Sequence, residues 1–151
     1  MGNTMIPSDE KISNLVIRQV VINRSRTLQQ ALNATGRKQY INKSVVATMP
    51  QGKGDEADVV FFNLGRYIRD ADLDKEYELR GLKPVDPFTL ATVNEADSAF
   101  ADDHPNGTHW KDVNGKWCFF TFSRWNDERI MGCDRYENGW DVYWWFAGLR
   151  K

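Results

Sequence analysis

The two histidines of the chain lie in an acidic stretch whose residue types could bind a metal ion or transfer protons. Asp102, Asp103, His104, His109 and Asp112 fall within eleven positions. The histidines are five residues apart, which does not match the helical spacing of two zinc-binding histidines. Asp, Asn, Pro and Gly also form turns. We therefore predict a turn-rich loop here, with no cofactor. The alternative is a small metal-dependent or acid/base hydrolase around Asp103, His104 and His109, in which the two histidines are the candidate metal ligands.

A cysteine nucleophile with a histidine base is a second arrangement that the residue types allow, through Cys118 and His109. Cys118 is followed by two phenylalanines in a segment typical of a strand, where a buried thiol is inert. A reactive cysteine needs a helix N-terminus or a cationic neighbour that lowers its pKa. Since no export signal precedes them, Cys118 and Cys133 are expected to be buried free thiols. The sequence therefore predicts no catalytic residue and favours a protein that is not an enzyme.

Residues 51–56, with the sequence QGKGDE, combine two glycines with a lysine. A phosphate-binding P-loop needs the pattern GxxxxGK[ST] between a strand and a helix. Only a GKG fragment is present here, between two expected strands. We interpret this segment as the flexible tip of a hairpin.

Positive charge is concentrated in the first third of the chain. Residues 11–54 contain eight Lys or Arg and no Asp or Glu, although the whole chain has a net charge of −1. These side chains could neutralise the phosphates of a nucleic acid, or they could face the acidic remainder of the chain. The overall pI of about 6.1 favours the second interpretation. For the nucleic-acid alternative, which uses segment 18–43, the candidate residues are Arg18, Arg24, Arg26, Arg37 and Lys38.

Aromatic residues are concentrated at the other end, where all six tryptophans lie between residues 110 and 145. Along 117–125 (WCFFTFSRW), side chains alternate between two faces of a strand, and both faces begin with apolar residues. One buried face does not account for this surplus. We expect most aromatic side chains to form a core and the others to form a surface that binds a protein partner. The candidates for this surface are Trp110, Trp125, Trp140 and Trp145.

The elements that must position these residues can be predicted in the first two-thirds of the chain from caps and breakers. Residues 12–22 suit either a helix or a strand, and we favour a strand over 15–22. Further strands are expected at 45–49 and 58–64, joined as a hairpin over 45–64. Helices are expected over 28–35, from Asp70 or Asp72 to Arg80, and from Pro87 to Asn94. Their caps or stops are Thr27, Gly36, Gly81 and Asp86.

The last third of the chain alternates strand and turn signals. Asn114-Gly115, residues 126–128 and Asn138-Gly139 are expected turns. They separate segments rich in aromatic and β-branched residues at 108–111, 117–125, 129–136 and 141–149. Successive strands joined by tight turns predict an antiparallel meander over 108–149.

Together these elements predict an α+β fold in which a mainly antiparallel sheet, formed by the 45–64 hairpin and the 108–149 meander, packs against two or three short helices. Residues 1–10 are expected to be a flexible leader and 11–151 a single domain. No apolar run reaches the roughly 20 residues of a membrane span, and no signal peptide is visible. We expect a cytoplasmic protein that does not bind membranes. The core is predicted to centre on Val60, Phe62, Trp117, Phe119, Trp144 and Phe146.

Four segments of the chain support a family resemblance. They are TLQQALNATGRKQY, EYELRGLKPVDP, HPNGTHWKDVNGKWCFFTFSRW and the closing WWFAGLRK. Over about residues 18–151, the chain resembles a group of small bacterial proteins of unknown function. The resemblance implies a bacterial, cytosolic accessory protein and assigns no catalytic residue. The function that we expect is a non-enzymatic protein-binding or regulatory module that uses its aromatic sheet.

Overall fold

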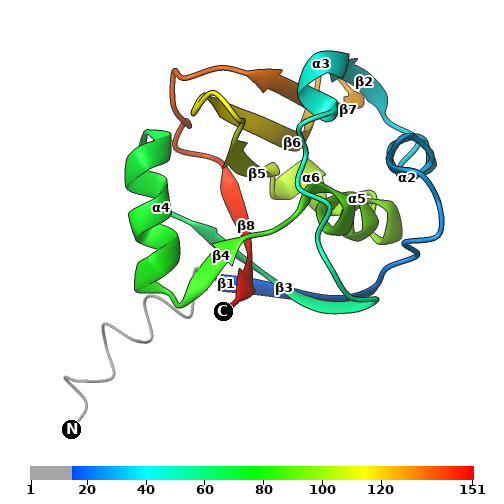
Figure 1. Cartoon of the computed structure of the whole chain (residues 1–151), viewed down its shortest axis with the longest axis horizontal. Helices are drawn as coiled ribbons and strands as arrows, with labels where there is room; N and C mark the ends of the chain where they lie inside the picture. Colours follow the sequence, from blue (N-terminus) through cyan, green and yellow to red (C-terminus); the bar gives the residue numbers. More distant parts are fainter. Residues whose placement is uncertain (1–14) are drawn as a thin grey trace, which may run out of the picture.

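The computed structural model describes residues 15–151. In this part of the chain, eight strands form one mixed sheet, and five helices pack on it (Figure 1). The leader expected at residues 1–10 lies outside the described residues. The strand order is β1–β3–β8–β5–β6–β7–β2, and β4 also pairs with β8. The strands are β1 (Leu15–Val21), β2 (Lys38–Ile41), β3 (Glu56–Asn63), β4 (Leu82–Pro84), β5 (Asn106–Lys111), β6 (Trp117–Trp125), β7 (Glu128–Arg135) and β8 (Trp145–Arg150); the helices are α2 (Leu28–Ala34), α3 (Lys43–Val46), α4 (Asp70–Leu79), α5 (Pro87–Ala96) and α6 (Phe100–Asp103).

Two of the three predicted helix caps form; the exception is α4, whose N-cap residue is Arg69 rather than Asp70 or Asp72 and makes no side-chain cap hydrogen bond. The Thr27 side chain accepts a hydrogen bond from the Gln30 N–H, and the Gln30 side chain accepts one from the Thr27 N–H, which is a capping box at the start of α2. Asp86 accepts from the Thr89 N–H ahead of α5. The α+β class and the mainly antiparallel pairing of the sheet are confirmed, but two strand pairs, β2–β7 and β5–β8, are parallel.

The expected hairpin over 45–64 does not form. Its first half is the short helix α3, because the Asn42 side chain accepts a hydrogen bond from the Ser44 N–H and so caps a helix there. The strand in this region is instead β2, which runs parallel to β7. Strand β3 pairs with β1 and β8, at opposite edges. The β-branched pair Val45-Val46 was therefore a weaker signal than the cap.

The predicted meander is correct for three of its four strands. β5, β6 and β7 pair antiparallel in sequence order, and the turn before β7 places Asn126 and Asp127 at positive φ, as a tight hairpin requires. The last strand leaves this order. β8 pairs with β3 and β5 in the middle of the sheet and does not touch β7.

Both faces of the sheet carry buried side chains, and they form two separate clusters. The larger cluster lies between the sheet and helices α2, α3, α5 and α6, and the smaller one lies under α4 (Figure 1). Five of the six predicted core residues belong to the smaller cluster: Val60, Phe62 and Phe146 are buried in it, and Phe119 and Trp144 pack against it. Trp117 belongs to neither cluster. The larger core uses the alternate positions of the same strands, and its members include Val59, Phe61, Phe120, Phe122, Met131, Cys133 and Ala147.

Two strands pair with the same edge of β8, one after the other along its length, and the sheet splits into two branches there. β5 pairs with the first residues of β8, Trp145 and Phe146, while β4 pairs with its last three. Beyond this point β5 diverges from β8. The Thr108 hydroxyl donates to the carbonyl of Val85 at 2.7 Å and holds the two branches together. The remaining space between them becomes the largest hollow described below.

None of the helices in the described part of the chain is both long enough and apolar enough to cross a membrane.

Candidate functional site

His109 on β5 is held between two carboxylates of helix α4. Its Nδ1 lies 2.7 Å from Oδ1 of Asp70, and its Nε2 lies 2.7 Å from Oδ1 of Asp74. The two aspartates are one helical turn apart and therefore face the same side of α4. His109 is 2% exposed, and its ring stacks on Trp117 at a centroid distance of 4.3 Å.

This geometry favours the imidazolium form of His109, since only a ring with a proton on each nitrogen can donate to both carboxylates. Burial lowers the pKa of His109, but the hydrogen bonds to Asp70 and Asp74 outweigh burial and raise the pKa above its ordinary value. The ring is therefore a buried positive charge between two negative charges. Because both nitrogens are occupied, it is not positioned to accept a proton from a substrate.

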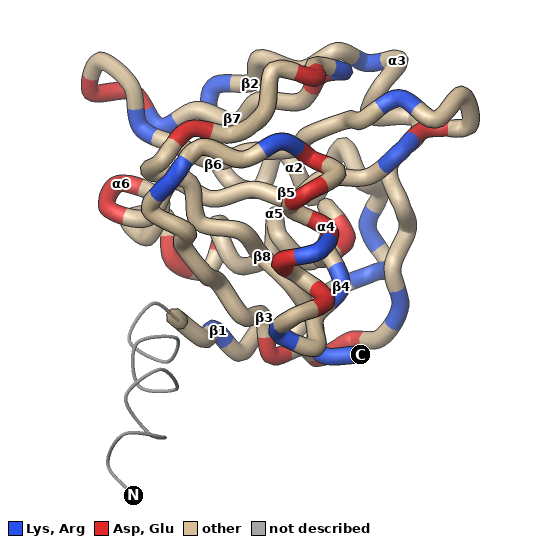
Figure 2. Tube along the Cα trace, turned by 90° about the vertical axis from the view of Figure 1, so that its left-hand side faces the viewer, with Lys and Arg blue, Asp and Glu red and all other residues tan. Residues whose placement is uncertain are grey.

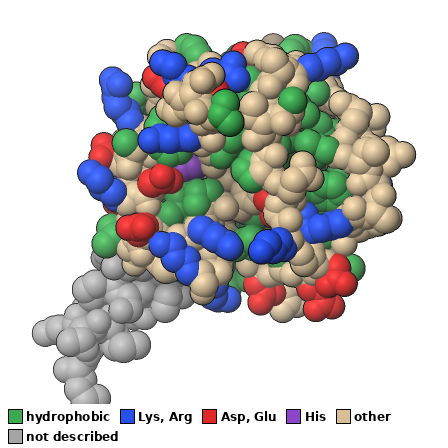
Figure 3. Space-filling model, in the orientation of Figure 1, with side chains coloured by type: hydrophobic (Ala, Val, Ile, Leu, Met, Phe, Trp, Pro, Cys, Tyr) green, Lys and Arg blue, Asp and Glu red, His purple; other side chains and the backbone are tan. Residues whose placement is uncertain are grey.

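A groove of about 760 Å³ opens beside His109, where β4 and β5 separate. Figure 3 shows Lys and Arg side chains gathered on this face around hydrophobic side chains and a histidine. Its charged members are Lys53, Lys83, Lys111, Asp74 and the buried Asp86. The other residues that line it are Pro50, Gln51, Gly52, Pro84, Val85, His109, Trp110, Trp117 and Leu149.

One wall of this groove is the loop at residues 50–54, which Arg24 holds in place. The Arg24 guanidinium donates to the carbonyls of Gln51, Lys53 and Gly54, and also to Asp86 and Thr89. This segment was predicted to be a flexible hairpin tip. In the structure the segment is a coil that packs against the start of α5. It is not a hairpin tip because the helix α3 precedes it, and Arg24 donates hydrogen bonds to its carbonyls.

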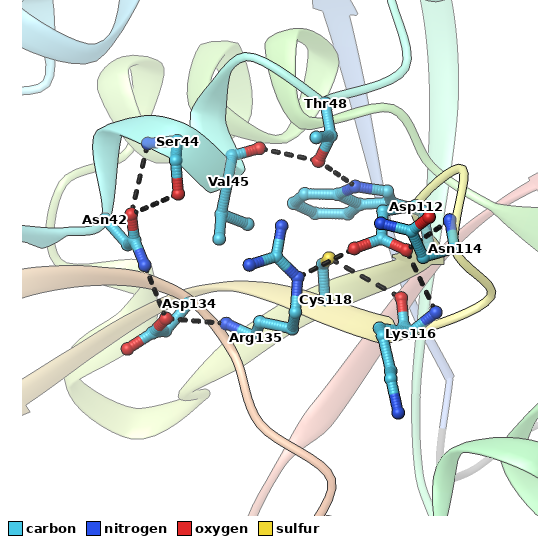
Figure 4. A network of polar contacts seen from close by, with 11 residues as sticks. Asn42, Ser44, Val45, Thr48, Asp112, Asn114, Lys116, Cys118, Asp134 and Arg135 are labelled. Atoms are coloured by element: carbon cyan, nitrogen blue, oxygen red, sulfur yellow. Dashed lines mark hydrogen bonds and ion pairs between the residues drawn. The ribbon is translucent and has the colours of Figure 1, made fainter.

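A second polar network fixes the far end of the groove. The Trp110 indole N–H donates to the Thr48 hydroxyl at 3.0 Å. Asp112 accepts from the N–H groups of Asn114 and Lys116 and from Arg135 Nε, so the β5–β6 turn is tied to β7 (Figure 4). The groove therefore has fixed walls, while its three lysines extend from them.

A smaller hollow lies between β6 and the connection from β7 to β8, on the second face of the sheet, which is the face that α4 covers. This aromatic pocket has a volume of about 170 Å³. Its rings belong to Phe119 on β6 and to Tyr136, Trp140 and Trp144 in the connection between β7 and β8. Trp140 is 5% exposed and packs edge-to-face on Trp144 at a centroid distance of 5.6 Å. Thr121 and Gly139 complete the lining.

Trp140 connects this pocket to His109. Its indole N–H donates to Oδ1 of Asp70 at 2.8 Å, the same oxygen that His109 contacts. Its backbone pairs with Ile68 in an isolated antiparallel bridge. One hydrogen-bonded chain, Asp74–His109–Asp70–Trp140, thus runs from the groove to the aromatic pocket.

The four tryptophans proposed as binding residues occupy different environments. Trp110 is buried in the larger core, and Trp145 is half-buried against the same core. Trp125 is 70% exposed at the end of β6. Only Trp140 lines the aromatic pocket. Trp144 also lines the pocket. We had assigned Trp144 to the core because a strand was expected over 141–149, whereas this residue lies in the connection before β8.

The five proposed nucleic-acid residues have partners within the chain. Arg18 lies 3.9 Å from Asp97, and Arg26 pairs with Glu95. Arg37 is buried and donates to three carbonyls, and burial lowers its pKa. Lys38 pairs with Glu128, and Arg24 holds the 50–54 loop. Figure 2 shows basic and acidic segments interspersed along the backbone of the molecule.

The residues of the hydrolase alternative are not brought together by their own contacts. His104 stacks on Phe100 at 4.7 Å and lies against Trp145, whereas His109 contacts α4. Asp103 ends α6, a short helix within the predicted acidic loop. Among residues 15–151, no group of three or more His, Cys, Asp or Glu side chains is arranged to hold a metal ion.

The two cysteines are buried free thiols, as predicted. Cys118 pairs in register with Trp110, and Phe119 with His109, so Cys118 and His109 point to opposite faces of the sheet. Burial raises the pKa of Cys118, and it raises that of Cys133 to about 12. Neither thiol is activated as a nucleophile.

No family model, curated protein or solved structure matches the chain. The resemblance to a group of small bacterial proteins therefore stays a prediction.

Sequence reasoning did not single out Asp74, Lys83 and Lys111 as site residues. The available signal was the pair Asp70 and Asp74, whose spacing places two carboxylates on one helix face, although nothing in the sequence indicates that His109 meets them.

Proposed function

We propose that the protein is a non-enzymatic binding module whose aromatic pocket receives a basic side chain of a protein partner. The observation that carries this proposal is a hollow lined by four aromatic rings on the second face of the sheet. Its volume of about 170 Å³ is close to the roughly 150 Å³ cavity that accepts a benzene molecule. The pocket therefore fits one side chain or one alkylammonium group.

The charge around the pocket supports a cationic occupant. Aromatic faces attract ammonium and guanidinium groups, and rings that surround a cation are a recurrent recognition device. The connection from Tyr136 to Trp144 carries Glu137 and Asp141 and contains no Lys or Arg. Both carboxylates are exposed. A partner that presents Lys or Arg would meet complementary charge at the rim.

The surface next to the pocket supports a macromolecular partner. Tyr136, Val142 and Tyr143 are 59%, 49% and 53% exposed. Large exposed apolar side chains beside a pocket are typical of protein interfaces, where aromatic residues are enriched. Trp140 is held by Asp70 and by its backbone bridge to Ile68, so one wall is rigid before binding, which lowers the cost of association.

The test is a titration with the amides of N-acetyl-lysine, N-acetyl-arginine and N-acetyl-trimethyllysine, followed through the indole N–H signals of Trp140 and Trp144 by nuclear magnetic resonance. We expect saturable shifts of both signals with the basic probes and none with the amide of N-acetyl-proline. Trp144→Ala should weaken the best probe by about tenfold, which corresponds to a cation–π energy of about 1–2 kcal/mol. Trp125→Ala is the matched control, because it removes an exposed tryptophan outside the pocket. Preference for the proline probe, or the absence of any saturable shift, would contradict the proposal.

A further inference from the structure

The three lysines of the groove have no anionic partner within the described chain. Lys53, Lys83 and Lys111 line the groove and are exposed. The lysine ion pairs among residues 15–151 involve Lys38, Lys75 and Lys151 instead. Lys111 Nζ lies 4.9 Å from the centre of the Trp117 ring. Three free ammonium groups around one hollow create a positive potential that attracts anions.

The loop at residues 50–54 adds hydrogen-bond donors to this positive charge. Arg24 occupies the carbonyls of Gln51, Lys53 and Gly54, while the N–H groups of residues 51–54 donate to no acceptor in residues 15–151. Gly52 and Gly54 both have positive φ. Successive free N–H groups in a turn with left-handed residues form an anion-binding concavity. The basic and glycine-rich segment QGKGDE therefore has the backbone chemistry of a phosphate site without the P-loop motif.

The negative groups of the groove are already paired. Asp86 is 6% exposed and accepts from Arg24 and from both the backbone N–H and the hydroxyl of Thr89. The Asp74 carboxylate lies 2.7 Å from Nε2 of His109, whose pKa the neighbouring carboxylates raise. One imidazolium lies between two carboxylates, so the group Asp70–His109–Asp74 keeps one net negative charge. The three lysines outweigh it and leave the groove with a positive balance.

The size and lining of the groove indicate a small ligand with an organic portion. A volume of about 760 Å³ lies within the roughly 300–1,000 Å³ of small-molecule sites. Pro84 and Leu149 are half-buried and provide apolar surface next to the lysines, whereas Trp110 and Val85 line the groove but are almost fully buried. The Trp117 ring is stacked on His109 and lies beneath Lys111, so it supports the site rather than offering a free face.

We propose that this groove binds a small phosphorylated compound, with a di- or triphosphate group among Lys53, Lys83, Lys111 and the N–H groups of residues 51–53. The apolar lining would contact the organic portion. The phosphate chain could belong to a nucleotide or to an inorganic polyphosphate. This site is independent of the aromatic pocket and does not rest on the function proposed above.

Isothermal titration calorimetry with inorganic triphosphate, ATP and adenosine tests the assignment. We expect triphosphate and ATP to bind and their affinities to fall with salt. Equal affinities would assign a site for the phosphate chain alone, whereas tighter binding of ATP would show that the apolar lining contacts the organic portion. Binding of adenosine without triphosphate, or of neither anion, would overturn the proposal. A single-stranded 20-nucleotide DNA that binds more tightly than triphosphate would overturn the assignment to a small ligand.

A pair of double variants locates the site. Lys83→Gln with Lys111→Gln should weaken triphosphate at least tenfold, because two of the three free charges are removed. Lys75→Gln with Lys151→Gln makes the same change of net charge outside the groove and should leave the affinity within twofold. Thermal unfolding midpoints of both variants verify that the fold is kept. An equal loss in the two variants would show attraction by net charge alone and would overturn the site.

Discussion

The charged groove and the aromatic pocket differ in how firmly their contact groups are held. The groove has fixed walls, but its charges lie at the ends of three exposed lysine side chains. The pocket is formed by rings that pack on one another, and its Trp140 is 5% exposed and hydrogen-bonded to Asp70. Mobile charges suit a ligand recognised by its charge, whereas fixed rings suit a group recognised by its shape.

The two hollows nevertheless share one support. Asp70 accepts from Trp140 at the pocket and faces His109 at the groove. A change at His109 should therefore affect both the groove and the aromatic pocket. A change in the wall of one hollow should affect binding at that hollow only. This difference can be tested by four measurements, which follow from the largest expected effect to the smallest.

The largest effect is expected for His109→Leu. The substitution removes the donors to Asp70 and leaves a carboxylate that is 6% exposed with the Trp140 indole as its remaining donor. Loss of one partner from a buried charged pair destabilises a protein by about 3–5 kcal/mol, and we expect about 3 kcal/mol in urea unfolding. Asp74→Asn is the control, because a carboxylate that is 49% exposed should contribute less than about 1 kcal/mol. Equal unfolding midpoints for wild type and His109→Leu would refute the shared support.

Gly107→Ala should affect the aromatic pocket alone. A Cβ at this position would lie 2.9 Å from two carbons of the Trp140 ring and 3.0 Å from the Phe120 carbonyl oxygen. Overpacking of this kind costs about 1–3 kcal/mol, and it would displace Trp140 from the pocket wall. We expect a lower urea midpoint and weaker binding of the basic probes, with the affinity for triphosphate unchanged. A simultaneous loss of triphosphate binding would show that the two hollows are not separable.

Gly52→Ala should affect the groove alone. A Cβ there would lie 2.2 Å from Cγ of Asp86, at a φ of +72°, so the loop at residues 50–54 must move. We expect a cost above about 1 kcal/mol and a loss of triphosphate affinity, with unchanged binding at the aromatic pocket. Gly36→Ala is the matched control, since its φ is +69° and nothing lies within 4 Å of the added Cβ. If Gly36→Ala weakens triphosphate equally, backbone strain rather than loop displacement is the cause.

The smallest effect is expected from pH. The pKa of His109 is raised in the folded state, so its stabilising contribution is complete below the unfolded pKa of about 6.5 and is lost as pH rises through the folded pKa. The urea midpoint of the wild type should therefore fall between pH 6 and pH 9 relative to that of His109→Leu. Parallel midpoints for the two proteins over this range would show that His109 carries no extra proton.

Local sequence signals predicted many of the helices, strands and turns. They failed where contacts between residues distant in the sequence determine the structure. Thr27, Asp86-Pro87 and the β6–β7 turn behave as their residue types require. Helix α3 was missed because the strand expected at 45–49 rested on Val45 and Val46, and the sequence analysis did not consider Asn42 as a cap. The position of β8 between β3 and β5 could not be predicted, since no local feature encodes which edges a strand will join.

The same distinction explains the two hollows. The aromatic pocket is built mostly from residues 119–144, and its composition was visible in the sequence as an aromatic surplus. The groove combines residues from six separate parts of the chain, between Pro50 and Leu149. His109 was noticed for its residue type, but its partners follow from the packing of α4 on the second face of the sheet.

The central position of β8 has a consequence for synthesis of the protein. In the sheet, β8 alone joins the β1–β3 pair to the β5–β6–β7–β2 group, yet it is the last strand of the described chain to leave the ribosome. Until it does, β3 and β5 each present an unpaired edge of backbone donors and acceptors, which favours association with other chains. A nascent chain that stops before Trp145 should therefore engage chaperones more strongly than a chain that includes β8.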